Sequence, residues 1–131
     1  MTTSDYLLIS RGQWDESASK EDVQDAIDRF YTWYEQGLAD GVLKPGSRLE
    51  HRGKQVSRSG ITDGPFAEAK ELVGGYRFIV ADSLEHAAQI AAGNPCLAFG
   101  LTLEIRPLEA ERAGADTVTN ETPATWRSAA E

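Results

Sequence analysis

The feature that most constrains the fold is one apolar stripe along a predicted helix. Apolar residues recur at spacings of three and four residues at Val23, Ile27, Phe30, Tyr34 and Leu38. This is the period of one face of an α-helix. Because a helix with a single apolar face must bury it against another layer, the chain requires a sheet or further helices to cover the stripe.

The ends of this helix and a second helix are marked by capping signals. Ser19 is placed to cap the first helix, and Gly37 and Gly41 are placed to close it. A second, small-residue helix follows over residues 84–91, with Asp82 and Glu85 spaced as a capping box. The turn residues 93–95 then predict its end.

Strand-like segments flank both helices. Residues 6–9 form a short apolar run, residues 76–81 are rich in aromatic and β-branched side chains, and residues 101–106 alternate apolar with polar residues. Each pattern is typical of a β-strand in a half-buried or buried sheet.

The middle of the chain is more polar. Residues 48–51 and 55–58 flank the turn signal at 52–54 and predict a polar hairpin. Residues 61–66 predict a further turn, and residues 67–72 are short and compatible with a helix.

In chain order the pattern is β, α, β with an inserted hairpin, β, α, β. This order predicts an α+β, ferredoxin-like βαββαβ fold with two helices on one face of an antiparallel sheet. The other face of the sheet needs a cover, and a second copy in a two-fold dimer is the simplest one. We expect a domain over residues 1–108 and a C-terminal tail over residues 109–131, rich in Ala, Thr and Glu.

Charge and composition limit the kinds of partner, location and binding site that we expect for this chain. The net charge of −8 disfavours direct binding to nucleic acid, because it would repel a phosphate backbone. No apolar run suits export or a membrane span, so the expected location is the cytoplasm. One cysteine and two histidines leave no Cys or His metal-site spacing, and no cofactor motif is present.

Several segments resemble the YCII-related family, and specifically its subgroup named for an Asp-Gly-Pro-Phe (DGPF) motif. They are YLLI at 6–9, ADGVL at 39–43, TDGPFAEAKELVGGY at 62–76 and LTLEIRPL at 101–108. The resemblance implies a dimeric ferredoxin-like α/β barrel. Members of the subgroup are similar in fold to muconolactone-isomerase-like proteins, and most have no established reaction, so the fold carries no activity by itself.

In one branch of the wider family, the resemblance implies a catalytic pair of a helix histidine and an aspartate before a proline. Alignment by eye places Arg29 near the first position and Asn94 at the second. An arginine is not a base near neutral pH and an amide does not titrate, so this pair is predicted to be missing.

Asp63, in the signature turn, is the best candidate for a catalytic carboxylate that moves a proton. The competing interpretation, favoured about two to one, is that the Asp63 side chain braces the turn by accepting hydrogen bonds from backbone N–H groups ahead of Gly64. Arg29, Tyr34 and Asn94 are candidates for binding a small anion, against the simpler roles of surface charge, core residue and helix cap. His51 is a further candidate if it lies near a cleft.

Three functions therefore stay open at this stage. The favoured one is a homodimer that binds a ligand or a partner without the His-Asp pair. The alternative is a small-molecule isomerase or lyase that uses Asp63 for proton transfer, and the third is a purely structural homo-oligomer.

Overall fold

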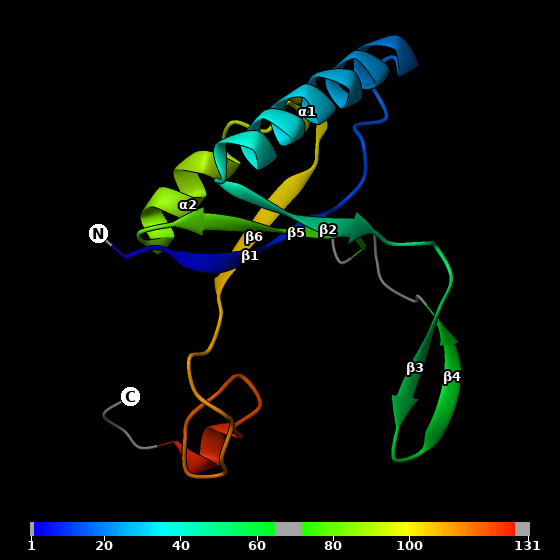
Figure 1. The fold of residues 1–131 in the computed structure, drawn as a ribbon. Coiled ribbons are helices and arrows are strands. Elements are labelled where there is room, and N and C mark those ends of the chain that lie inside the picture. The colour runs from blue at the N-terminus through cyan, green and yellow to red at the C-terminus, as the bar shows by residue number, and fades with distance from the viewer. Residues whose placement is uncertain (1, 65–71, 128–131) are drawn as a thin grey trace.

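The sheet is the centre of the fold, and each of its strands pairs in the antiparallel direction. The computed structural model describes residues 2–64 and 72–127 (Figure 1). The strand order is β2-β5-β1-β6. The strands are β2 (Leu43–Arg48), β5 (Val73–Ala81), β1 (Ser4–Arg11) and β6 (Thr102–Pro107).

Helices α1 (Lys20–Asp40) and α2 (Leu84–Ala91) lie on the same face of this sheet (Figure 1). The predicted α+β fold, compatible with a ferredoxin-like arrangement, is confirmed. Among the described residues there are also two short 3-10 helices: η2 (Pro95–Phe99) joins α2 to β6, and η3 (Ala124–Trp126) lies near the C-terminus.

The first helix begins and ends as its sequence predicts. The Ser19 hydroxyl accepts a hydrogen bond from the Asp22 N–H at 3.0 Å. The helix stops at Gly41, whose φ of 76° lies in the left-handed region that favours glycine. Gly37, in contrast, lies within α1 and is buried against Leu43 of β2.

The second helix begins one residue later than the capping-box pattern predicts. Its N-cap is Ser83, whose hydroxyl accepts from the His86 N–H at 3.0 Å. The Asp82 carboxylate instead lies 3.1 Å from the His86 Nδ1. The prediction of a capping box at Asp82 and Glu85 was wrong because two adjacent residues, Asp82 and Ser83, both suit an N-cap.

The core lies between the sheet and the two helices. Its most buried members come from every layer: Leu8, Leu43, Ile79 and Ala81 from strands, and Ala87 and Ala91 from α2. Ile79 has no exposed surface and pairs with Leu43 across β2 and β5. Alternation along β1 and β5 then directs Leu7, Ile9, Tyr76 and Phe78 to the opposite face of the sheet.

A hairpin is present, but it is not the predicted one: residues 48–51, the predicted first arm, are not part of it, and its turn lies elsewhere. Strands β3 (Gly53–Ser57) and β4 (Gly60–Gly64) form a separate two-stranded sheet, and the turn falls at residues 58–59. The prediction of a turn at 52–54 and of another at 61–66 was therefore wrong, since 61–64 belong to β4. Gly60, with a φ of 130°, supplies the backbone freedom that the actual turn needs. The predicted segment 67–72 lies outside the described residues except for Leu72.

The region that follows β6 carries little regular structure up to Arg127, apart from η3. It is held by local contacts: Arg127 donates from Nη2 to the Thr119 carbonyl at 2.9 Å, and the Thr119 N–H donates to the Thr122 hydroxyl at 2.9 Å. Residues 118–120 border a groove against Leu7 and Ile9 of the sheet.

Candidate functional site

A cavity of about 210 Å³ lies between α1 and the sheet. Its wall is largely apolar and aromatic, with Phe30, Tyr31 and Trp33 from α1, and Leu8 and Leu103 from the sheet. At about 30 Å³ for each water molecule, the volume equals about seven waters. The cavity therefore suits a small molecule rather than a nucleotide or a peptide.

Arg77 brings a positive charge into this apolar setting. It lies on β5 directly opposite Leu8 of β1, on the face of the sheet that α1 covers. Its guanidinium carbon lies 4.5 Å from the centre of the Tyr34 ring and 5.1 Å from that of Phe30. The two rings are themselves stacked, with centroids 5.7 Å apart and planes 5° from parallel. These cation–π contacts hold the guanidinium against α1.

The hydrogen bonding of Arg77 is incomplete. Its Nη1 donates to the Tyr76 carbonyl at 3.4 Å, which is long for a hydrogen bond. Its Nε is buried and finds no hydrogen-bond partner among the described residues. A buried donor without an acceptor costs about 1–3 kcal/mol, more when it is charged. The Arg77 guanidinium therefore has unused capacity for an acceptor.

A second arginine lines the same cavity. Arg48 is the last residue of β2 and pairs with Gly75 of β5, two residues before Arg77. Of the described residues that line the cavity, none is Asp or Glu. Two guanidinium groups thus face one cavity without a carboxylate in its wall, which favours an anion there.

The floor of the cavity is fixed by η2. The Asn94 side-chain oxygen accepts from the Cys96 N–H at 2.9 Å and so caps this 3-10 helix. The Cys96 thiol lies 3.8 Å from the Ala26 carbonyl of α1. Burial raises the pKa of the Cys96 thiol, and the positive charges of Arg48 and Arg29 offset part of that rise. Cys96 is therefore a thiol at neutral pH and not a ready nucleophile.

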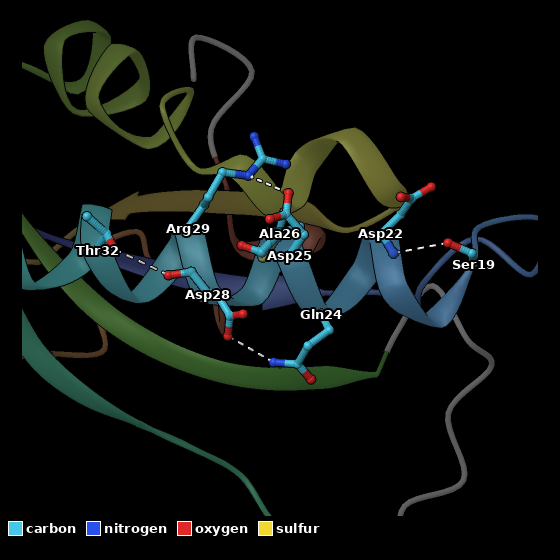
Figure 2. Close-up of polar contacts among 9 residues, drawn as sticks. Ser19, Asp22, Gln24, Asp25, Ala26, Asp28, Arg29 and Thr32 are labelled. Atoms are coloured by element: carbon cyan, nitrogen blue, oxygen red, sulfur yellow. Dashed lines mark hydrogen bonds and ion pairs between the residues drawn. The ribbon is translucent and has the colours of Figure 1, made fainter.

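The predicted ligand-binding residues are only partly brought together. Asn94 lines the cavity, and Tyr34 packs on the Arg77 guanidinium at its edge. Arg29 is absent from the cavity wall and forms an ion pair with Asp25, one turn earlier, at 3.0 Å. Figure 2 shows Arg29 among polar contacts that run along α1 itself. Arg29 instead lines a separate groove with Gly93 and Pro95, so the structure does not bring the three residues together in one cavity.

Asp63 and His51 lie away from the cavity. Asp63 is on β4, with its side chain 84% exposed, and forms an ion pair with Lys54, its cross-strand partner. His51 lies between β2 and β3 and borders an open groove near the hairpin. Catalysis by Asp63 stays a prediction.

Arg77 and Arg48 are the residues that sequence reasoning missed. Alternation along β5 could have found Arg77, because Gly75, Ile79 and Ala81 on the same face are all buried. Tyr76 and Phe78 flank Arg77 in the sequence, but their side chains lie on the opposite face of the sheet. Arg48 carries no such signal, because it ends a polar strand.

Residues 2–64 and 72–127 contain no group of three or more His, Cys, Asp or Glu side chains arranged to hold a metal ion. Within the same ranges, every helix is too short or too polar to cross a membrane.

The fold and the cavity define a small α+β protein with two helices on one face of its sheet and an arginine-lined cavity between them. The family model of the YCII-related domain matches residues 6–109. The chain belongs to the YCII-related family. No curated protein matches it.

Proposed function

We propose that the chain binds a small organic anion, a carboxylate on an aromatic ring or a compound of similar shape, in the cavity between α1 and the sheet. The observation that carries this proposal is the buried Arg77 Nε without a hydrogen-bond partner among the described residues. A ligand oxygen would satisfy this donor, and hydrogen bonds to a charged group contribute about 1.5–3 kcal/mol.

The rest of the wall supports an aromatic ligand. Trp14, Tyr31 and Trp33 line the cavity with apolar surface that a ring can cover. Arg48 adds a second positive charge at the end of β2. The charged end of the ligand would thus meet the arginines while its ring meets the aromatic side chains.

We further propose that the functional unit is a homodimer. Leu7, Ile9, Tyr76 and Phe78 occupy the sheet face that the helices leave open, and each is only partly buried. Beside them Glu104 accepts hydrogen bonds from Arg11 at 2.7 Å and from Arg106 at 3.1 Å. Half-buried apolar residues with a polar border suit a two-fold interface.

We also propose that the chain belongs to the DGPF subgroup of the family, because its sequence carries that motif at residues 63–66.

Calorimetric titration tests the binding proposal. The probes are benzoate, phenylacetate and phenyl phosphate, with benzamide as a neutral ligand of the same shape as benzoate. We expect at least one anion to bind, and benzoate to bind about 10–100 times more tightly than benzamide, because only the anion forms a charge-assisted hydrogen bond.

Two variants with the same net charge provide the control. Arg77→Met should weaken anion binding by about 10–100-fold, whereas Arg29→Met, which removes an exposed arginine that is absent from the cavity wall, should change it by less than about twofold. Failure of every anion to bind, or equal binding by the two variants, would overturn the proposal. Sedimentation equilibrium tests the dimer separately, and a monomer at every concentration would contradict it.

A further inference from the structure

The β3–β4 hairpin exposes an apolar pair that nothing in the described chain covers. Val56 and Ile61 lie directly opposite each other across the two strands. Val56 is 73% exposed and Ile61 is 67% exposed, and among the described large hydrophobic residues only Trp126, also at 67%, matches Ile61. Both are β-branched residues of the kind that sheets normally bury.

The two faces of the hairpin differ in character. Alternation places Lys54 and Asp63 on the same face as Val56 and Ile61, where they form the neighbouring cross-strand pair. The opposite face presents Gln55 and Thr62. One face is therefore apolar with an ion pair at its end, as in a small contact patch, and the other is polar.

Such a hairpin needs a partner for stability. A two-stranded hairpin by itself is at best marginally stable in water, and a covered apolar face is what stabilises it. Every residue of β3 is exposed, so residues 2–64 and 72–127 do not supply that cover.

The position and the charge of the hairpin point to a second copy. Figure 1 shows the hairpin on the opposite side of the sheet from α1 and α2, the side of the open sheet face. The hairpin, residues 53–64, contains Lys54, Arg58 and one carboxylate, Asp63, a net charge of +1 in a chain of −8, so the other residues together carry −9. The basic hairpin region is thus complementary in charge to the remainder of an identical chain.

We infer that the β3–β4 hairpin is a docking arm that lays Val56 and Ile61 against a second copy of this chain. The inference rests on the homodimer proposed above. In a two-fold dimer each chain extends its hairpin along the other, so the apolar pair is buried twice.

Photo-crosslinking tests the contact directly. A benzophenone amino acid replaces Val56 in one sample and Leu84 in another, since Leu84 is also exposed but lies on the helix side of the sheet. Each is mixed with ¹⁵N-labelled protein and irradiated. We expect a product of twice the chain mass, containing labelled and unlabelled peptides, from position 56 and not from position 84.

The dimer dissociation constant gives a second, independent result. Val56→Thr with Ile61→Thr keeps the β-branched shape while adding a hydroxyl to each side chain, so the hairpin itself is retained. We expect sedimentation equilibrium to show a dissociation constant raised by about tenfold or more. Leu84→Thr should leave it within about twofold, because an exposed residue outside an interface contributes little.

The outcomes separate this inference from the proposals beneath it. A wild-type dimer with no crosslink from position 56 and an unchanged dissociation constant would overturn the docking arm while the homodimer stands. A wild-type protein that is monomeric at every concentration would overturn both. Neither result bears on the anion cavity, which the benzoate titration tests.

Discussion

The guanidinium carbon of Arg77 lies 4.5 Å from the centre of the Tyr34 ring, which links β5 to α1 through a cation–π contact. Tyr34 in turn stacks on Phe30 one helical turn earlier, so the arginine meets two rings presented on one face of α1. This contact aligns the helix over the sheet at the cavity. It also holds Arg77, whose Nε is buried without a hydrogen-bond partner among the described residues, in the wall of the cavity.

The first prediction is that Arg77→Met leaves stability nearly unchanged. The substitution removes a buried donor that costs about 1–3 kcal/mol when unsatisfied. It also removes a cation–π contact that contributes about 0.5–2 kcal/mol. Because the two effects oppose each other, we expect urea denaturation to give a free energy of unfolding within about 1 kcal/mol of wild type. A loss of more than about 3 kcal/mol would show that Arg77 is structural.

The second prediction concerns the contact of α1 with β2. A Cβ at position 37 would lie 2.3 Å from the Leu43 Cδ1, within a buried part of the core. Gly37→Ala should therefore destabilise the protein by about 1–3 kcal/mol, despite the better helix propensity of alanine. Gly114→Ala, where a Cβ meets nothing within 4 Å, is the matched control and should be near neutral. Thermal unfolding of both variants measures the difference.

The energetic coupling between positions 37 and 43 tests the steric explanation for Gly37→Ala. Leu43→Val shortens the side chain that a Cβ at position 37 would meet. The double variant should then be destabilised by less than the two single variants together. Full additivity would contradict the steric explanation.

The third prediction concerns the cap of η2. Asn94→Ala leaves the Cys96 N–H, which is buried, without its acceptor at 2.9 Å. We expect a loss of about 1–3 kcal/mol in urea denaturation. Asn94→Ser restores an N-cap oxygen and should recover part of that loss. Equal losses in the two variants would indicate that packing, and not the hydrogen bond, is what Asn94 contributes.

The fourth prediction is a pH dependence. Burial raises the pKa of the Cys96 thiol above its ordinary value of 9.0. Above pH 9 the unfolded chain loses this proton before the folded chain does, so the contribution of Cys96 to stability is complete below that pH and falls as the pH rises. Comparing wild type with Cys96→Ala isolates this effect from other groups. A stability difference that stays constant from pH 8 to 10.5 would contradict it.

The apolar elements of the fold could be predicted from the sequence, and the polar ones could not. Three sequence patterns predict a buried face, and each corresponds to an element of the structure. They are the stripe from Val23 to Leu38, the strand at residues 76–81 and the alternation at residues 101–106. In the hairpin the core dictates no pattern, because β3 is exposed on both faces. Gly53 therefore resembles a turn residue as much as Gly60 does, and the turn was predicted at residues 52–54 although it lies at 58–59.

The candidate site was predictable only in part. Asn94 could be placed near a cavity through the resemblance to the family. The direction of the Arg29 side chain could not be predicted, because the sequence does not fix how α1 is turned about its own axis relative to the sheet. Arg29 and Tyr34 are five residues apart, which places them on different sides of the helix. Arg77 emerges only when β5 and α1 are seen together, since its partners Phe30 and Tyr34 are more than forty positions away in the chain.

The most direct test of the central claim is NMR of the Arg77 Nε–Hε group in ¹⁵N-labelled protein, assigned by its loss in Arg77→Met. If an anion oxygen occupies the cavity, benzoate at saturation shifts this resonance downfield and slows its exchange with water, while benzamide does not. An unchanged Arg77 resonance at a benzoate concentration that saturates binding would contradict the account, because the ligand would then be bound elsewhere.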